Sequence, residues 1–476
     1  MLRRILLPIA LFAVAGSCAT NPATGKSMLS LVSESDEIKI GKEEAEKTKR
    51  QLGLYNDPKV QEYVRRVGNG LAAVSERPDL PWEFNVVEDD VVNAFALPGG
   101  PVFITRGILT HMNSEAELAS VLGHEIGHIT ARHSVQQMSK AQLAQVGLVA
   151  GSIFSKTVAQ YSGLAGQGLG ILFLKFGRDA ENEADELGFR YSVKDNYDVR
   201  EMAKMFRTLD RLSASSGGGR IPEWQSTHPN PENRVAKTQE RVAKLGRDLT
   251  GTKVNREQFL RLTDGMVFGK NPRQGFFREN TFYHPELKFQ FAFPLNWATS
   301  NQVSTVLSQS PEKDAVMQLT LAQGTAEEAA QKFFSQQGLT AGEVKKEQIN
   351  GLPATSGTFE AKLEDGSTIR GLATFLTYDG RTYYFMGYSP SARFSTTGPA
   401  MRQTVQSFKA VTDPAILSIR PAKVKLETVP SDMTLEQFNQ RLPSTVSVQQ
   451  LAIINGLEEG QTLKSGQLVK RVVGGK

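Results

Sequence analysis

Hydrophobic residues recur at helical spacing in the first half of the chain. Between residues 36 and 71 they stand at this spacing among many charged residues, which predicts two amphipathic helices broken near Pro58. Residues 82–105 carry the apolar runs and turn residues of an extended segment. Helical spacing returns from Ser114 to about His133. Further helices are predicted at residues 178–192 and 199–213.

After about residue 250, apolar and polar residues alternate as they do in half-buried strands. The pairs Asp365-Gly366 and Asp379-Gly380 are turn residues typical of hairpins. The phrases around Phe282 and Trp297 resemble the opening of PsbP/Mog1-like domains, which have an α+β fold. Strands are predicted at residues 289–293, 317–321 and 372–388, and helices at 326–337 and 399–408.

The last sixty residues form a third predicted unit. Residues 433–438, 448–456 and 466–469 resemble a degenerate LysM module, a small β-α-α-β unit that can hold glycan chains. The resemblance implies peptidoglycan as a partner. The alternative is a small docking domain that binds no sugar, since a fold does not determine a ligand.

These patterns predict an α+β multidomain protein. Its first domain is mainly α-helical with a small edge-strand sheet, and an α+β domain and a LysM-like unit follow. The expected boundaries are a signal peptide at 1–17, a Ser-, Thr- and Pro-rich tether at 18–35, a first domain at 36–250, an α+β domain at 276–412 and a C-terminal module at 415–476.

Residues 141–177 are apolar, rich in glycine and nearly uncharged. Residues 157–174 contain no charge, which leaves a membrane span open. The polar side chains and four glycines of this window favour a buried or membrane-grazing helical hairpin instead.

The start of the chain has the pattern of a secretory signal. Arg3 and Arg4 precede a short apolar stretch and small residues that lead to Cys18, the single cysteine. This arrangement resembles a bacterial lipoprotein lipobox, which implies lipidation of Cys18 and a membrane anchor. Ala19 in the next position resembles the sorting signal for the outer membrane. We therefore expect the periplasmic side of the outer membrane of a Gram-negative bacterium.

Composition narrows the function. The chain has 55 Lys and Arg against 50 Asp and Glu, an excess too small and too evenly spread for a nucleic-acid partner. One cysteine excludes a disulfide framework and a cysteine-based zinc site. Because there are only six histidines, two of them close together on one helix are informative.

Such a pair occurs at His124 and His128, within Leu122-Gly-His-Glu-Ile-Gly-His128. Residues four apart on a helix share a face, so both imidazoles can bind one ion. Glu125 follows His124 directly and can face a water molecule on that ion. The apolar neighbours indicate a buried helix, where imidazoles need partners.

A hydrolytic zinc takes three protein ligands and keeps one open position. His133 lies five residues after His128, so we expect it to point elsewhere on the helix. The acidic segment after Arg178 offers Glu181 and Asp185, which are one turn apart. One can ligate while the other orients a ligating histidine.

These two motifs resemble the zinc metallopeptidase family that contains HtpX, the CaaX prenyl endopeptidases and the periplasmic proteases BepA and LoiP. The resemblance implies one Zn²⁺ per chain, Glu181 as the third ligand and Asp185 as the residue behind a ligand, and it leaves Glu183 off the metal. It also implies an edge strand at Asn93, Ala94 and Phe95 that pairs with the substrate backbone. The alternative for Asn93 and Phe95 is plain strand packing.

The stretch from Ser226 to Arg234 resembles a family motif with a histidine and an arginine near the zinc. The resemblance implies that His228 and Arg234 stabilise the oxyanion, or that His228 caps the metal and silences it. The alternative is an ordinary Pro-rich loop. His111 and His284 are expected to be structural, because neither has a second ligand nearby in sequence.

The predicted function is a zinc endopeptidase with Glu125 as general base, acting on misfolded or stalled envelope proteins. The substrate class rests on the family resemblance. Two alternatives remain: an outer-membrane assembly factor or chaperone with latched protease activity, and a peptidoglycan-binding lipoprotein.

Overall fold

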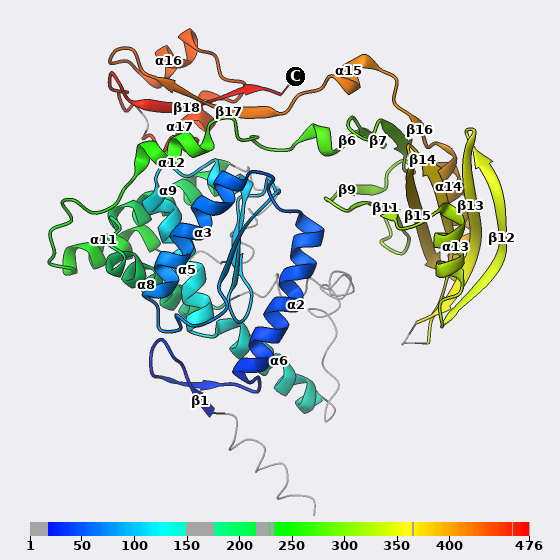
Figure 1. Ribbon diagram of the computed structural model, residues 1–476, viewed down its shortest axis with the longest axis horizontal. Helices are drawn as coiled ribbons and strands as arrows, with labels where there is room; N and C mark the ends of the chain where they lie inside the picture. Colours follow the sequence, from blue (N-terminus) through cyan, green and yellow to red (C-terminus); the bar gives the residue numbers. More distant parts are fainter. Residues whose placement is uncertain are drawn as a thin grey trace, which may run out of the picture. The chain divides into compact units, whose positions relative to one another are not determined.

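The computed structural model describes residues 18–148, 176–215, 228, 233–363, 366–458 and 460–475 (Figure 1). The predicted signal segment and most of the apolar stretch 141–177 lie outside the described residues. The chain divides into two compact units: Met1–Gly269 with Ala422–Val473, and Lys270–Pro421 with Gly474–Lys476. Among the described residues, none of the helices combines the length and hydropathy needed to cross a membrane.

Unit 1 is mainly helical and contains a small sheet. Its three-stranded sheet has the order β3-β5-β4, with β3 parallel and β4 antiparallel to β5. The elements before unit 2 are β1 Cys18–Thr20, β2 Ser27–Leu29, α2 Glu34–Leu52, α3 Pro58–Ala73, β3 Glu83–Val87, β4 Ala94–Ala96, β5 Pro101–Thr105, α4 Arg106–Leu109, α5 Glu115–Thr130, α6 His133–Leu148, α8 Arg178–Lys194, α9 Arg200–Ser215, α11 Arg234–Lys244 and α12 Arg256–Thr263.

The predicted break between the first two helices is confirmed. Asp57 caps α3, its side chain accepting hydrogen bonds from the backbone of Lys59 and Val60, and Pro58 occupies the first turn. Proline suits this position because the first turn needs no amide donor.

Residues 18–35, predicted as a tether, are folded. Strands β1 and β2 pair from Cys18↔Leu29 to Thr20↔Ser27, and the backbone N–H of Leu31 donates to Ser139 Oγ of α6 at 2.9 Å. Composition alone does not predict this contact, because it joins residues 108 positions apart.

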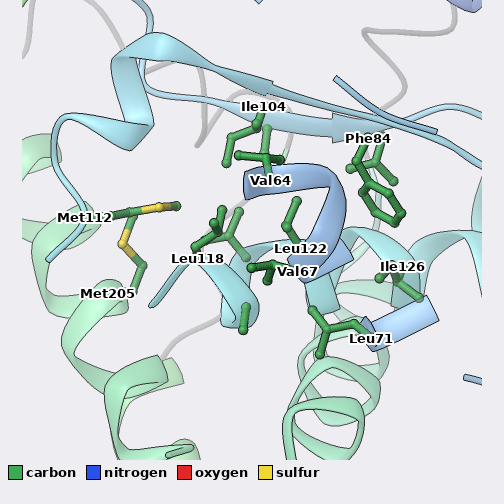
Figure 2. Packing of buried hydrophobic residues seen from close by; sticks show 14 of the residues in the cluster. Val64, Val67, Leu71, Phe84, Ile104, Met112, Leu118, Leu122, Ile126 and Met205 are labelled. Atoms are coloured by element: carbon green, nitrogen blue, oxygen red, sulfur yellow. The ribbon is translucent and has the colours of Figure 1, made fainter. Parts of the chain in front are cut away.

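The core of unit 1 surrounds helix α5, in which every residue is buried. Leu118, Leu122 and Ile126 of α5 pack with apolar residues of α3, of the sheet and of α9 (Figure 2). A helix that is buried on all sides holds its polar side chains in fixed positions. Those polar side chains include His124, Glu125 and His128.

Helix α5 ends at Thr130, three residues before the predicted end. Arg132 adopts a left-handed conformation with φ 55°, and α6 starts at His133. The guanidinium of Arg132 donates to Glu37 at 2.8 Å and to the carbonyl of Val32 at 3.0 Å. These distant partners hold the turn, which helical periodicity cannot show.

The C-terminal residues complete unit 1, with a core of their own. Their elements are β17 Ala422–Thr428, α16 Leu435–Arg441, α17 Val448–Ile454 and β18 Leu468–Gly474, with β17 paired to β18. Lys470 of β18 is fully buried, and its ammonium donates to the carbonyls of Thr110 and Met112 at 3.0 and 2.7 Å. These two carbonyls belong to the segment between α4 and α5. Peptidoglycan binding by this module stays a prediction.

Unit 2 is built on a seven-stranded antiparallel sheet of order β12-β13-β14-β15-β11-β10-β9, with a four-stranded sheet β16-β8-β7-β6. Apolar residues alternate along β14 and β15. Leu372 and Leu376 join the core with the four-stranded sheet and α14, while Ala373 and Phe375 pack with α13. Both faces of the large sheet are therefore covered.

The hairpin predicted at Asp379-Gly380 is confirmed: it joins β14 to β15, and both residues have positive φ. The elements of unit 2 are η1 Pro272–Gln274, β6 Phe276–Arg278, β7 Thr281–His284, β8 Phe289–Ala292, β9 Ala298–Asn301, β10 Thr305–Gln309, β11 Val316–Ala322, α13 Ala326–Phe334, β12 Leu339–Ile349, β13 Leu352–Lys362, β14 Thr368–Tyr378, β15 Arg381–Pro390, η2 Ser391–Arg393, α14 Phe394–Gln406, β16 Lys409–Ala410 and α15 Pro414–Leu417.

Candidate active site

Helices α5 and α8 approach each other closely because small residues line their contact. A Cβ atom on Gly123 would lie 3.1 Å from the Cα of Gly188, and one on Gly127 would lie 3.0 Å from the carbonyl oxygen of Ala184. The missing side chains let the two backbones pack directly. This packing brings the acidic face of α8 to the histidine face of α5.

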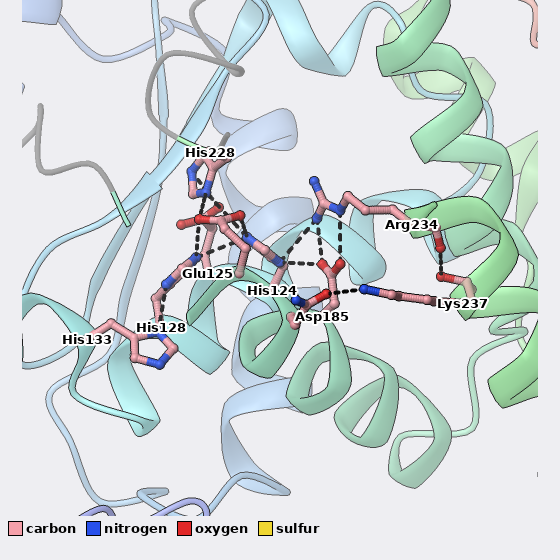
Figure 3. A network of polar contacts seen from close by, with 11 residues as sticks. His124, Glu125, His128, His133, Asp185, His228, Arg234 and Lys237 are labelled. Atoms are coloured by element: carbon pink, nitrogen blue, oxygen red, sulfur yellow. Dashed lines mark hydrogen bonds and ion pairs between the residues drawn. The ribbon is translucent and has the colours of Figure 1, made fainter. Parts of the chain in front are cut away.

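Four buried side chains converge at this contact, each with a potential metal-ligating atom within 4.8 Å of the others: His124, His128, Glu181 and His228. The Nε2 atoms of His124 and His128 are 3.0 Å apart. They lie 3.5 and 3.6 Å from carboxylate oxygens of Glu181. Figure 3 shows the histidines turned toward one another.

The two distances to Glu181 fit a tetrahedral metal ion, whereas the 3.0 Å between the two Nε2 atoms is shorter than that geometry gives. Two ligand atoms bound to zinc at 2.0–2.2 Å lie about 3.3–3.6 Å apart in tetrahedral geometry. Glu181 Oε2 is buried without a hydrogen-bond partner among the described residues, so a cation would satisfy it. The chemistry of this donor set, imidazole nitrogens and one carboxylate, suits zinc.

The protonation states also suit a metal. Burial, together with the charge of His124, holds the pKa of His128 well below its ordinary value, so this ring is neutral. Burial opposes ionisation of Glu181, but His228 and His124 outweigh it and hold its pKa well below the ordinary value. Burial would likewise lower the pKa of His124, but hydrogen bonds with Asp185 and Glu181 raise it to about 9. A cation would therefore displace a proton from His124.

Glu125 lies beside this cluster with a carboxylate that is fully buried. Neither of its oxygens has a hydrogen-bond partner among the described residues, and burial raises its pKa. The Nε2 atom of His228 lies 3.6 Å from Glu125 Oε1. A carboxylate with raised pKa and unused acceptors is suited to accept a proton.

Asp185 holds the outer nitrogen of His124. Its Oδ1 lies 2.8 Å from His124 Nδ1, and Arg234 binds the same carboxylate through Nε at 2.9 Å and through Nη2. The guanidinium of Arg234 also stacks on Phe206, with Cζ 3.9 Å from the ring centroid. The structure thus joins the predicted residues Asp185 and Arg234 in one buried ion pair.

His228 lies in the cluster rather than beside it. Its Nδ1 is 3.4 Å from His124 Nε2 and 3.2 Å from Glu181 Oε1. It therefore occupies the position of a fourth donor.

Two further side chains, His133 and Glu183, lie behind His128, and neither belongs to the metal cluster. His133 was expected to point away from His128, which is wrong: the Nδ1 atoms of the two rings are 2.9 Å apart. His133 Nε2 in turn lies 3.0 Å from Glu183. The turn at Arg132 causes the difference, because α5 does not continue to His133.

The predicted edge strand is β4. It lies at the edge of the three-stranded sheet, next to β5, and includes Ala94 and Phe95, while Asn93 directly precedes it. Phe95 stacks on Phe103 of β5 with ring centroids 5.3 Å apart. A role for these residues in substrate binding stays a prediction.

Comparison with known proteins agrees with this site. The model of "Peptidase family M48" matches residues 58–242, which include the whole metal cluster. Residues 58–242 form an M48 peptidase domain. A metallopeptidase domain of this family implies a catalytic metal, which the cluster on α5 and α8 can hold.

Two of the curated relatives are a bacterial and a yeast protease. The "Beta-barrel assembly-enhancing protease" of Escherichia coli is 31% identical over 245 residues, 49% of this chain and 49% of its own length. The "Mitochondrial metalloendopeptidase OMA1" of Schizosaccharomyces pombe is 36% identical over 181 residues, 37% of this chain and 52% of its own length. The matched region thus spans about half the length of these relatives.

Among solved structures, the cyanobacterial PsbP protein of Synechocystis matches 27% of this chain and 91% of its own length. The TM-score is 0.24 and the sequence identity 15%, a level that supports no statement about the fold of unit 2.

Proposed function

We propose that the chain is a zinc-dependent endopeptidase in which His124, His128 and Glu181 hold the ion. One observation carries the proposal: the unpartnered carboxylate of Glu125 lies on the same helix as two imidazoles that converge on Glu181. This arrangement provides a metal site and a base side by side.

Zinc in this site would supply a Lewis acid that polarises the scissile carbonyl and acidifies a water molecule. Glu125 accepts the proton of the attacking water and passes it to the leaving amine. Its burial supports this role, since the raised pKa makes the carboxylate a stronger base.

Asp185 keeps the proton of His124 on Nδ1, so that Nε2 presents its lone pair to the ion. Arg234, with His228, stabilises the oxyanion of the tetrahedral intermediate in this proposal. Arg234 Nη2 lies 3.4 Å from the outer nitrogen of His124, where it also binds Asp185.

Strand β4 would bind the substrate as an added strand. The hydrogen bonds of Asn93 with Thr105 and of Leu97 with Pro101 turn the backbone of these residues toward β5. In an antiparallel pair, the intervening Ala94 and Ala96 then direct their N–H and C=O groups to the opposite side. A peptide in extended conformation would pair with these groups.

The substrates we propose are misfolded or stalled envelope proteins, in line with the name of the Escherichia coli relative. We also propose that Cys18 is lipidated and anchors the chain at the periplasmic side of the outer membrane. The lipobox-like sequence supports this step.

A second candidate function is an assembly factor whose protease activity is latched. The position of His228 as a fourth donor favours it, because a fourth protein ligand closes the place that a hydrolytic zinc keeps open. In that case His228→Ala raises casein cleavage. Unchanged or lower cleavage in this variant contradicts the latch.

The deciding experiment compares casein cleavage and zinc content in the purified protein and in Glu125→Gln. We expect cleavage by the wild type alone and about one zinc in each protein. Substantial cleavage by Glu125→Gln would show that another group is the base. A wild type without zinc would overturn the proposal as a whole.

A further inference from the structure

His128, the second histidine of the cluster, has a partner on its outer nitrogen that is not itself a member of the metal cluster. His128 Nδ1 contacts His133 Nδ1 at 2.9 Å, and His133 Nε2 contacts Glu183 Oε2 at 3.0 Å. The three side chains form a chain that leads from the metal cluster to the surface of α8. Figure 3 shows the ring of His133 directly beside that of His128.

The contacts fix the position of the ring proton in both His128 and His133. With His128 Nε2 turned to the cluster as a ligand, its proton must sit on Nδ1. His133 Nδ1 must then accept that proton's hydrogen bond, which places the proton of His133 on Nε2. This second proton points at the carboxylate of Glu183, which can only accept. One tautomer of each ring therefore satisfies both hydrogen bonds.

The backbone is strained at the turn that places His133 beside His128. A continuous helix would place His133 five residues, or about 140° of rotation, from the face of His128. The left-handed Arg132 ends α5 and turns His133 back, a conformation that costs a non-glycine residue about 1–2 kcal/mol. Glu37 holds the Arg132 guanidinium and so maintains the turn.

The two histidine ligands are held differently. His124 meets a carboxylate directly, through Asp185, and that carboxylate is already paired with Arg234. His128 meets its carboxylate through an intervening ring. The side chain of Glu183 is 24% exposed and lines a cavity of about 490 Å³ together with His133. Its charge is therefore partly solvated, which lowers the cost of keeping it ionised.

We propose that His133 and Glu183 are positioning residues that fix the tautomer and orientation of His128 and thereby tighten metal binding. The inference rests on the proposed function, because it requires a metal on His128. Partners behind a metal ligand typically change metal affinity by 10–100-fold when they are lost.

The test measures the zinc dissociation constant of the purified full chain by competition with a chromophoric chelator. His133→Phe keeps a planar ring but cannot accept from His128, so we expect binding 10–100-fold weaker than in the wild type. His133→Asn places an amide oxygen near the position of Nδ1, and we expect it to recover most of the affinity. A merely structural role would not restore metal affinity through an acceptor atom.

Glu183→Ala should weaken zinc binding in the same direction but less, because His133 remains. It decides the matter if His133→Phe does not fold. Lys140→Ala, which changes another side chain of α6 in the same cavity, is the matched control and should bind zinc like the wild type.

Wild-type affinity in His133→Phe, or in Glu183→Ala where that variant decides, overturns the inference. It leaves the proposed function intact if the wild type still binds zinc and cleaves casein. Loss of zinc and cleavage from the wild type itself would instead mean that the proposed function fails.

Discussion

Gly188 of α8 lies against the backbone of His124 of α5. A Cβ atom on Gly188 would be 2.7 Å from the backbone nitrogen of His124, closer than real side chains approach. The close approach of the helix that carries Glu181 to the helix that carries the histidines thus depends on the absence of a side chain at Gly188, as it does at Gly123 and Gly127.

Substitution of Gly188 by alanine is expected to push α8 away from α5. The clash involves backbone atoms, which cannot move aside as a flexible side chain can, so stability should fall by about 1–3 kcal/mol. Zinc content should fall as well, because Glu181 would retreat from His124 and His128. Gly177→Ala is the control, since nothing lies within 4 Å of its added methyl group. Equal zinc content in both variants would show that the close approach is not needed.

Removal of the Arg234 side chain is expected to be costly because it leaves the charge of Asp185 buried alone. Arg234→Met should lower the free energy of unfolding by about 3–5 kcal/mol, measured by chemical denaturation. Lys237 lies on the same helix as Arg234 and makes a single contact, with Asn182. Lys237→Met should therefore change the free energy of unfolding by less than about 1 kcal/mol. Similar losses in the two variants would contradict a special role for the buried pair.

Lys470→Met tests the docking of the C-terminal module. The substitution keeps the length of the side chain but leaves the carbonyls of Thr110 and Met112 without their ammonium donor, at a cost of about 1–3 kcal/mol. The exposed Lys464, which pairs with Asp432, offers the control Lys464→Met. An unchanged thermal midpoint in Lys470→Met would mean that these contacts do not stabilise the protein.

The protein should lose stability in acid partly through His111. Burial lowers the pKa of this ring to about 4, although the hydrogen bond that its Nδ1 donates to the carbonyl of Gly107 acts in the opposite direction. Its Nε2 is buried without a hydrogen-bond partner among the described residues. The unfolded chain takes up this proton near pH 6.5, and the folded chain only near pH 4. The unfolded state therefore binds more protons in this window, and stability falls as pH falls, by roughly 3 kcal/mol in total.

Denaturant unfolding of the zinc-loaded wild type and of His111→Gln at several pH values measures this contribution. The stability advantage of the wild type should shrink between pH 6.5 and pH 4, because the variant has no proton to take up here. A difference that stays constant with pH would contradict the assignment.

The part of the metal cluster that could be predicted from the sequence is the part whose residues lie close together on one helix. His124, Glu125 and His128 share one helix, and Glu181 and Asp185 share another, so spacing alone places each pair on a common face. His133 could not be predicted in this way. Its position depends on the left-handed Arg132, and that turn is held by Glu37, which lies 95 residues away in the sequence.

The same limit applies to the fold. Strand alternation and turn residues predict the hairpin of β14 and β15, because the strands are adjacent in sequence. Nothing in the composition of residues 18–35 indicates strands β1 and β2, whose fold is supported by a contact with α6.

The burial of Lys470 also sets an order of events during synthesis. The ammonium contacts carbonyls 358 and 360 positions earlier, so these bonds can form only after the ribosome has made the chain as far as Lys470. The segment Lys270–Pro421 of unit 2 is translated in between. The segment before the helix that carries His124 and Glu125 is thus held by a residue that is made long after it, and a chain that stops before Lys470 would lack this support.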